Sequence, residues 1–411
     1  MNLVEVLPFL KNRTDYQKTN FEKFLSRISF TYDIPSIHIT GTNGKGSTAT
    51  YIASIYKEAG YKVGLFVSPY FNEMNEMISV NKDNIHDEEL TEIVNKYKKY
   101  FEKYELSEFE VETFIALTHF KEEKVDIAVI ECGMGGALDA TNVFTPILSI
   151  ITTVTLEHTE FLGKSIAEIA YSKAGIIKQE VPVLIGELNK EAETTIAGVA
   201  DDTNSKIYKV ATPFDIKRID DGISFSYREI KDVVLDSRAK YAVKNAALAL
   251  EAIDILRTKF TVFEVDIKKA LASTHMINRL EVLMEKPLVI IDGAHNVEAI
   301  HELVDSIFYI RKNKAIHTIF ASFRDKNIAL MLPELALLSE DLSLTTFDHP
   351  RARKEEEYFL FSEEYKFYSD YLSLIKNKMK EYPDDLILIT GSLAFVSKVR
   401  NDYNLGKLKN E

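Results

Sequence analysis

The chain has 411 residues, which is too long for one ordinary core, so two domains are expected. Its 46% hydrophobic and 27% charged residues are typical of a globular protein, and its net charge of −13 argues against a nucleic-acid binder with a basic face. The single cysteine, Cys132, excludes an intrachain disulfide, and no apolar run approaches the roughly 18 residues of a membrane-spanning helix.

Strands and helices alternate through the first two thirds of the chain, which predicts a parallel sheet with right-handed crossovers. The periodicity predicts strands at 36–40, 62–68, 125–131, 147–154 and 181–185. It predicts helices within 1–30 and at 48–59, 87–104, 110–121, 165–177, 188–201 and 241–256. A loop is expected at 70–84, and a small antiparallel patch at 223–227 and 233–235.

The alternation restarts near residue 276 and predicts a second α/β unit of about 130 residues, an ordinary domain size. Its predicted strands are 288–291, 316–321, 342–347 and 386–390. Its predicted helices are 297–311, 327–338, 362–381 and 393–400. We therefore predict an α/β protein with domains at 1–275 and 276–411.

A glycine-rich loop joins the first predicted strand to its helix. Gly41, Gly44 and Gly46 let main-chain N–H groups come close to a ligand, and the helix that follows adds free N–H groups and a positive dipole end. Lys45 adds a full charge, and Ser47 can reach a phosphate or a phosphate-bound metal. We interpret this stretch as a nucleotide-phosphate loop.

The strict pattern G-x-x-x-x-G-K-[ST] is not matched by this loop. Ile39 stands where the first glycine belongs, and Gly46 separates Lys45 from Ser47. A glycine-rich strand-to-helix turn without a ligand therefore remains the alternative.

Ligands of open α/β sheets bind beyond the carboxyl ends of the strands, and polar residues stand at several of these ends here. Ser68 and Glu131 each end a predicted strand, and His158 follows another. Hydroxyl and carboxylate oxygens suit the Mg²⁺ that accompanies a nucleotide triphosphate. For Glu131 a helix cap or salt bridge remains open, and for His158 metal binding and plain hydrogen bonding are both open, because imidazole prefers softer metals.

Two further places carry candidate residues. Lys173 lies on a predicted helix, where a lysine is usually solvated. Asp292 and His295 flank a glycine-containing turn at the end of the strand 288–291, which suits either a pair of ligand contacts or a turn with an Asn helix cap. No G-x-S-x-G pattern indicates a hydrolase triad, and one cysteine excludes a Cys/His zinc cluster.

Taken together, segments from about residue 36 to 400 resemble the folate branch of the Mur ligase family, the folylpolyglutamate synthases and dihydrofolate synthases. Each segment is weakly specific, but their order and spacing match the family. The segments are ITGTNGKGST (39–48), GMGGALDATNV (133–143), HTEFLG (158–163), KAGIIK (173–178), KNAALAL (244–250), DGAHN (292–296), Asp325-Lys326 and TGSLAFVSKV (390–399).

The resemblance implies a P-loop NTPase-like parallel-sheet domain that binds ATP, followed by a smaller Rossmann-like ligase domain. It implies that ATP, with Mg²⁺, phosphorylates a carboxylate of folate or dihydropteroate. The amine of L-glutamate then attacks the acyl phosphate, and an amide, ADP and phosphate result. We expect a cytoplasmic monomer with these small-molecule substrates and with neither nucleic acid nor membrane as partner.

The resemblance also implies roles for single residues. Those expected to contact ATP are Gly41, Thr42, Asn43, Gly44, Lys45, Gly46, Ser47, Asn245, Arg279 and Asp292. Those expected on Mg²⁺ are Ser68, Glu131 and His158. Those expected in catalysis are Lys173, which matches a lysine that the family carries carbamylated, His295, which matches a position near the glutamate and acyl phosphate, and Arg279. Those expected at the other substrates are Tyr70, Ala137, Asp139 and Ser392.

Several positions depart from the family pattern. Tyr70 replaces a histidine, and Ala137 replaces a basic residue. Asn75 and Met77 stand near positions that usually carry arginines, and Ala394 replaces an aromatic residue. Because folates are anionic, this loss of positive charge leaves the acyl substrate less defined than the ATP chemistry.

Two other functions are compatible with these motifs. One is a Mur-type ligase for another carboxylate, such as a cell-wall nucleotide precursor, although the loop beginning at Gly41 leaves no room for the separate N-terminal domain of such ligases. The other is a non-catalytic ATP-binding regulator, and the joint presence of five residues argues against it: Lys45, Glu131, His158, Lys173 and His295.

Overall fold

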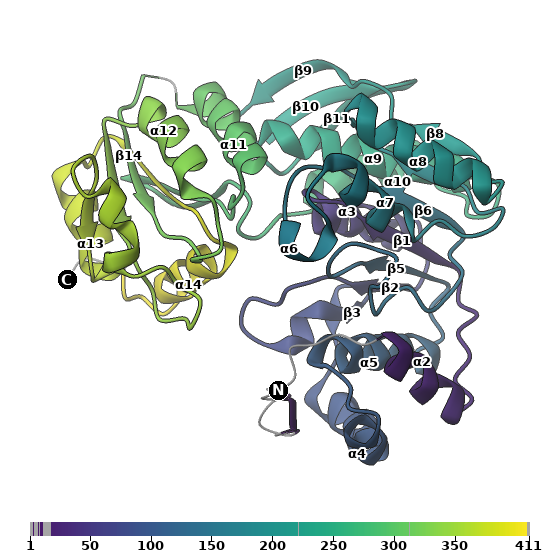
Figure 1. Cartoon of the computed structure of the whole chain (residues 1–411). Helices are drawn as coiled ribbons and strands as arrows, with labels where there is room; N and C mark the ends of the chain where they lie inside the picture. The colour runs from purple at the N-terminus through teal and green to yellow at the C-terminus, as the bar shows by residue number, and fades with distance from the viewer. Residues whose placement is uncertain are drawn as a thin grey trace. The chain divides into compact units, whose positions relative to one another are not determined.

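The computed structural model describes residues 3, 7, 9–10, 18–220, 222–311 and 313–408 (Figure 1). The chain divides into two compact units. The first comprises Met1–Asp215, Phe225–Val233 and Lys244–Thr274, and the second comprises Ile216–Ser224, Val234–Val243 and His275–Glu411. The predicted helix within 1–30 lies partly outside the described residues, and α2 covers Lys18–Arg27.

The first unit contains an eight-stranded sheet in the order β4-β3-β2-β5-β1-β6-β7-β8. Its strands are β1 (Ser36–Thr40), β2 (Val63–Phe66), β3 (Ile78–Val80), β4 (Asp83–Asn84), β5 (Ile127–Glu131), β6 (Leu148–Ile151), β7 (Val183–Ile185) and β8 (Ile207–Lys209). β1 pairs in parallel with both β5 and β6, and all residues of these three strands are buried. Strands buried on both faces explain why their sequences are almost continuously apolar.

Helices cover both faces of this sheet (Figure 1). α2, α4 (Asp87–Lys103) and α5 (Glu108–Glu122) pack on one face through a cluster that includes Phe24, Phe101 and Phe114. α3 (Lys45–Glu58) contacts β1, β2 and β5, and α10 (Glu264–Ser273) packs on α3. The remaining helices are α6 (Thr159–Leu162), α7 (Ile166–Ala174), α8 (Lys190–Asp202) and α9 (Lys240–Leu256).

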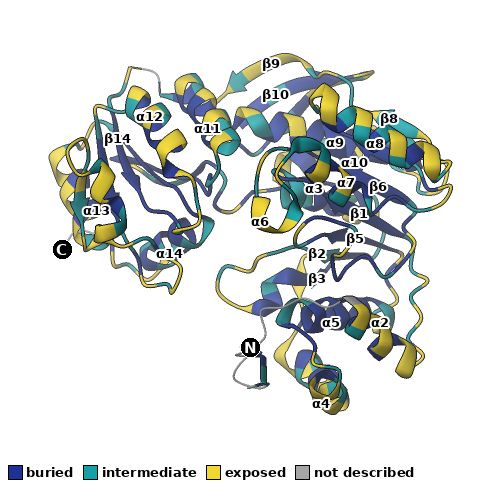
Figure 2. Ribbon diagram, viewed as in Figure 1, coloured by how far each residue is buried: buried dark blue, intermediate teal, exposed yellow. Residues whose placement is uncertain are grey.

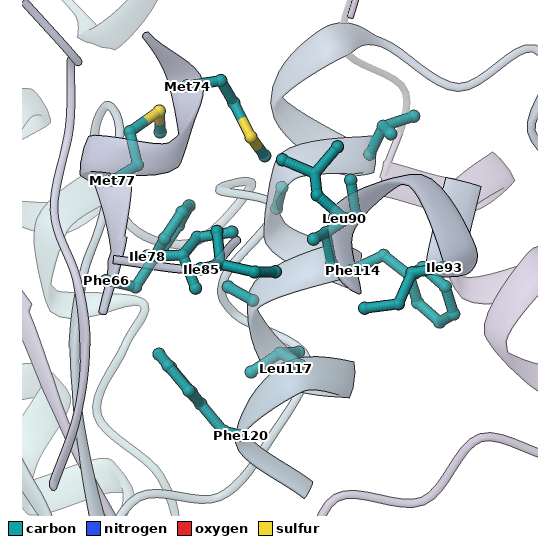
Figure 3. Close-up of a cluster of buried hydrophobic side chains, with 14 of the residues drawn as sticks. Phe66, Met74, Met77, Ile78, Ile85, Leu90, Ile93, Phe114, Leu117 and Phe120 are labelled. Atoms are coloured by element: carbon teal, nitrogen blue, oxygen red, sulfur yellow. The ribbon is translucent and has the colours of Figure 1, made fainter. Parts of the chain in front are cut away.

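The segment 70–84, predicted as a loop, contains regular structure, so that prediction is wrong. It forms the 3₁₀ turn η2 (Met74–Met77) and the strands β3 and β4, with β3 antiparallel to β2. Figure 3 shows Met74 and Met77 pointing into the same apolar cluster as Phe114. Burial of one such side chain contributes about 1.5–3 kcal/mol, which offsets part of the conformational entropy lost when this segment is ordered.

The second unit contains a six-stranded sheet in the order β12-β13-β17-β14-β15-β16, parallel except for β12. Its strands are β12 (Glu281–Glu285), β13 (Leu288–Ile291), β14 (Ile316–Phe320), β15 (Asp341–Thr345), β16 (Lys366–Tyr368) and β17 (Leu386–Thr390). Its helices are α11 (Val297–Ile310), α12 (Ile328–Leu338), η3 (Glu355–Phe361), α13 (Tyr371–Glu381) and α14 (Leu393–Asn404).

The predicted helix at 362–381 is wrong in its first half. β16 pairs with β15 there, and α13 begins only at Tyr371. The Asp370 carboxylate accepts hydrogen bonds from the N–H groups of Leu372 and Ser373, at 3.0 and 3.3 Å, and so caps the helix.

The predicted antiparallel patch is a three-stranded sheet of β9 (Phe214–Ile219), β10 (Gly222–Tyr227) and β11 (Ile230–Leu235). The central strands of both large sheets are buried, and the outer faces of the helices are exposed (Figure 2). Among the described helices, none combines the length and the apolar character that crossing a membrane requires.

Candidate active site

The glycine loop leads from β1 into α3, which begins at Lys45, three residues earlier than predicted. Gly44 precedes the helix with φ 84°, in the left-handed region. A Cβ at Gly44 would also lie 2.3 Å from Oδ1 of Asn245 on α9. Only glycine meets both conditions, and no side chain of this residue covers the first N–H groups of α3. The helix start therefore presents main-chain donors suited to phosphate.

Threonines that follow β6 hold the loop in this shape. Thr153 accepts hydrogen bonds from the N–H groups of Thr42, at its carbonyl oxygen (2.8 Å), and of Asn43, at Oγ1 (2.9 Å). Thr152 Oγ1 donates to the Asn43 carbonyl at 2.6 Å. The sequence prediction missed both threonines, although their place directly after a strand at the ligand edge of the sheet is a usable signal.

Glu131, at the end of β5, lies beside the loop. Its Oε1 is 3.9 Å from Nζ of Lys45, and its Oε2 accepts a hydrogen bond of 3.0 Å from the Ser68 N–H. A Cβ at Gly46 would be 3.1 Å from the same Oε2. The structure therefore brings together Lys45, Ser68 and Glu131, which lie in three separate segments of the sequence. A buried carboxylate next to a hydroxyl-bearing residue is an oxygen donor set that fits Mg²⁺.

His158 directly precedes α6 with φ 50°, and its Nε2 lies 3.9 Å from Oε1 of Glu157. Its side chain is 39% exposed, so it can reach a ligand from the surface. Within the described part of the chain, no group of three or more His, Cys, Asp or Glu residues forms a metal cluster. Because Ser68 is one of the three predicted ligands, this finding does not bear on the predicted set, and the role of His158 stays a prediction.

Lys173 on α7 is only 3% exposed, so it is not a solvated lysine. Burial, and secondarily the charge of Lys45, lower its pKa from 10.5 to about 7, although Cys132, Glu157 and Asp139 oppose this shift. A substantial fraction of this amine is therefore neutral near pH 7, which is the form that reacts with electrophiles such as carbon dioxide.

The loop after β5 is held by Asp139. Its carboxylate accepts hydrogen bonds from the Met134 N–H at 2.8 Å and from the N–H and hydroxyl of Thr141 at 3.0 and 2.5 Å. Burial raises its pKa, and these hydrogen bonds counteract the shift. Asp139 thus shapes the loop, and a direct contact with substrate stays a prediction.

Two other predicted substrate residues have different surroundings. The Ala137 N–H donates to the Ser172 carbonyl at 2.8 Å, and its methyl group faces Gly175, where a Cβ would be 2.3 Å away. Tyr70 is 39% exposed and can meet a ligand. Asn75 and Met77, two of the departures from the family pattern, are buried, and Met77 belongs to the core.

Cys132 and His38 form a buried polar contact beneath the same loop. His38 Nε2 lies 3.1 Å from Cys132 Sγ and 2.8 Å from Thr141 Oγ1. Burial lowers the pKa of His38 to about 3 and raises that of the Cys132 thiol. Both groups are buried and the thiol stays protonated, so we interpret this contact as structural.

In the second unit, Asp292 lies in the turn after β13. Its carboxylate accepts hydrogen bonds from the N–H groups of Leu280 and Ala294, both at 2.8 Å, and from the Tyr241 hydroxyl. Burial raises its pKa, while the positive charge of Arg279 lowers it. The sequence prediction included Asp292 and Arg279 but missed Tyr241, which carries no recognisable motif.

His295 and Ser392 lie in two turns at the carboxyl ends of β13 and β17, which are adjacent strands. His295 Nδ1 is 2.8 Å from the Gly293 carbonyl, and Asn296 caps α11, as the turn interpretation predicted. Ser392 is 2% exposed, and its Oγ has no hydrogen-bond partner among the described residues. A buried hydroxyl without a partner is costly, which suggests that a ligand completes it.

Comparison with known proteins identifies the family. Residues 39–253 match the Mur ligase middle domain, and residues 278–393 match the Mur ligase, glutamate ligase domain. The chain belongs to the Mur ligase family. Its relatives place it in the folate branch of this ligase family.

One relative is the dihydrofolate synthase/folylpolyglutamate synthase of Bacillus subtilis, which is 34% identical over 89% of this chain and 90% of its own. The folylpolyglutamate synthase of Lacticaseibacillus casei is 31% identical over 99% and 100%. A solved FPGS–AMPPCP–folate complex has a TM-score of 0.85 at 29% identity and covers 98% of this chain and 100% of its own. These findings confirm the predicted α/β fold class, and as a Mur ligase this protein is an ATP-dependent ligase.

Proposed function

We propose that this Mur ligase joins L-glutamate to a carboxylate of folate or dihydropteroate at the cost of ATP, releasing ADP and phosphate. The observation that carries the proposal is the contact of Lys45 with Glu131 at the uncapped start of α3. The names of its Bacillus subtilis and Lacticaseibacillus casei relatives support the acyl substrate.

The chemistry begins with a poor electrophile. A carboxylate reacts slowly with an amine, and its phosphorylation by ATP installs a leaving group. The amine of glutamate then attacks the acyl carbon, the tetrahedral intermediate expels phosphate, and an amide remains. Positioning of the reactants and neutralisation of negative charge are what the protein must supply.

The loop from Gly41 to Ser47 supplies positioning and charge neutralisation for the phosphates. The free N–H groups of α3 and the ammonium of Lys45 are positive groups with fixed positions. Glu131 and Ser68, with His158, would hold Mg²⁺, which when bound neutralises phosphate charge and orients the phosphate oxygens. Asn245, which contacts the loop at Gly44, is the third element of this nucleotide site.

Lys173 acts on the acyl side in this proposal. Its buried and partly neutral amine can take up carbon dioxide to become a carbamate, as in the family that the chain belongs to. Formation of the carbamate replaces a cation with an anion, which would suit a place beside the Mg²⁺ that accompanies the phosphate. Tyr70, Ala137 and Asp139 are the residues proposed for contact with the acyl substrate.

The second unit supplies the remaining groups. Arg279 and Asp292 contact the nucleotide in this proposal, and the Leu280 and Ala294 N–H groups fix the Asp292 carboxylate for this task. His295 and Ser392 contact glutamate and the acyl phosphate. The unpartnered hydroxyl of Ser392 is the observation that supports its role.

The test combines purified protein with ATP, Mg²⁺, labelled glutamate and either dihydropteroate or tetrahydrofolate. Stoichiometric ADP and labelled amide are expected with at least one of these acceptors. ADP formed only with a different carboxylate would favour a Mur-type ligase for another substrate. ATP binding without turnover on any acceptor would favour the non-catalytic regulator.

A further inference from the structure

The first turns of α5 carry an acid in an unusual place. Glu112 is only 5% exposed and lies between apolar residues such as Val111 and Phe114. Among the residues that the structure describes, none forms a hydrogen bond or an ion pair with its carboxyl group. Native proteins rarely leave a buried carboxyl group without a partner, because its desolvation is not compensated.

Glu112 shares its helix face with Glu108, four residues earlier. Both acids raise the pKa of Tyr70, after burial as the main cause. Burial and the charge of Glu108 in turn raise the pKa of Glu112 to about 8, so this carboxyl group becomes a carboxylate near pH 7 only when donors of a bound ligand stabilise the charge. The carboxyl groups of Glu108 and Glu112 and the Tyr70 hydroxyl therefore lie close to one another.

These three side chains lie next to the candidate active site. Phe109, between the two acids on α5, stacks on Phe66 of β2 with ring centroids 5.9 Å apart. A Cβ at Gly133, in the loop after β5, would lie 2.7 Å from the Phe109 ring. The start of α5 thus lies against the ends of β2 and β5, which carry Ser68 and Glu131.

The chemical character of these three side chains indicates which part of a ligand they can bind. The carboxylate forms of Glu108 and Glu112 repel an anion, so the carboxylates of a folate do not fit here. A carboxylate instead matches a planar edge with two parallel N–H donors, in the bidentate geometry that guanidinium groups use. The 2-amino-4-oxopyrimidine edge of a pteridine has such a pair, the ring N3–H and the 2-amino group.

We propose that Glu112 is a specificity-determining residue that accepts two hydrogen bonds from the 2-amino-4-oxopyrimidine edge of the pteridine substrate, with Tyr70 and Glu108 beside it. The inference rests on the proposed function and deepens it. This role of Glu112 also accounts for the loss of basic residues near Tyr70. The protein binds the neutral N–H donor edge of the substrate at this place, and not its negatively charged groups.

The experiment compares two substrates in two proteins. Wild type and Glu112→Gln are assayed with tetrahydrofolate and with its 2-desamino-2-methyl analogue. Wild type is expected to have a KM roughly tenfold or more higher for the analogue, because a hydrogen bond to a charged group is lost. In Glu112→Gln the KM for tetrahydrofolate rises by a similar factor, and the discrimination between the two substrates falls to less than about twofold.

Glu122→Gln is the matched control, since it makes the same change at an exposed site on the same helix. It should keep the discrimination of wild type, and neither variant should change the KM for ATP. A purely structural Glu112 could lower activity or the melting temperature but would leave the discrimination between the two substrates unchanged, and that result overturns the assignment. Absence of ligation by wild type with any pteroate or folate would instead overturn the proposed function itself.

Discussion

The ammonium nitrogen of Lys45 lies 3.9 Å from Oε1 of Glu131, at the point where α3 begins and β5 ends. This pairing sets a cationic side chain and a buried acidic side chain beside the main-chain donors of the loop, which suits a phosphate and a divalent cation. The same carboxylate is oriented by the Ser68 N–H.

Lys45→Ala should abolish ADP formation, because it removes the only full positive charge within the loop 41–47. Steady-state ADP release with all substrates present checks this. Lys57→Ala, at an exposed position in the last turn of α3, is the control and should retain wild-type turnover. Near wild-type turnover in Lys45→Ala would exclude the loop as the ATP site.

Glu131→Gln should keep the acceptor for the Ser68 N–H but lose the charge that attracts a divalent cation. The Mg²⁺ concentration for half-maximal activity is expected to rise roughly tenfold or more. A titration of activity with Mg²⁺ at saturating ATP measures it. An unchanged titration curve would remove Glu131 from the metal site.

Lys173 should take up carbon dioxide in a pH-dependent way. Its pKa of about 7 lies below the ordinary 10.5, so the reactive neutral amine is scarce below about pH 7 and accumulates as the pH rises through that value. Protein incubated with ¹³C-bicarbonate should show a carbamate signal by NMR that grows over this range. Lys173→Met should abolish the signal, whereas Lys164→Met, at an exposed site, should keep it.

The same shift predicts the pH dependence of stability. In the unfolded chain Lys173 binds its proton up to about pH 10.5, whereas in the folded chain it releases it above about pH 7. The unfolded state thus binds more protons between these values, and the Lys173 contribution to the free energy of unfolding rises with pH there. The free energy of unfolding of wild type minus that of Lys173→Met, measured by urea denaturation, should therefore increase as the pH rises across this range.

Ser392→Ala should separate stability from function. The buried Ser392 hydroxyl has no partner among the described residues, so its removal should leave the free energy of unfolding unchanged or raise it by up to about 1 kcal/mol. The KM for glutamate should rise nonetheless. Ser397→Ala on the same helix is the control, because its hydroxyl bonds Asn278 at 2.9 Å and the Leu393 carbonyl at 2.7 Å. That variant should lose stability without a change in the KM for glutamate, and the reverse pattern would refute the role of Ser392.

Glu251→Ala should destabilise the first unit. Glu251 on α9 is buried and accepts hydrogen bonds from the Tyr227 hydroxyl and from two nitrogens of Arg228, at 2.5, 2.8 and 2.7 Å. Its loss leaves the Tyr227 hydroxyl without an acceptor for its proton, although the Ala211 N–H still donates to it at 3.0 Å, at a cost of about 1–3 kcal/mol in the free energy of unfolding. Urea denaturation measures this cost, and Glu229→Ala, at an exposed position nearby, should change it by less than about 0.5 kcal/mol.

The correct sequence predictions rest on local patterns. The strand 36–40, the glycine loop and the helix after it follow from residues that are neighbours in sequence, and β1 matches the prediction. Ser68 and Glu131 were selected because each ends a strand, and in a parallel sheet such ends meet at one edge. The wrong predictions, at 70–84 and 362–381, fall where pairing with a distant strand overrides local propensity, as β3 with β2 and β16 with β15 show.

The sequence by itself determined the α/β alternation, the phosphate loop and the ligase motifs, because glycine placement and apolar periodicity act over a few residues. Only the tertiary structure decided which polar groups are buried. It placed Lys173, Glu112 and Ser392 away from water and left the carboxyl group of Glu112 and the hydroxyl of Ser392 without a partner in the described chain. Burial depends on the packing of segments far apart in sequence, and it is burial that moves a pKa or makes a side chain available to a ligand.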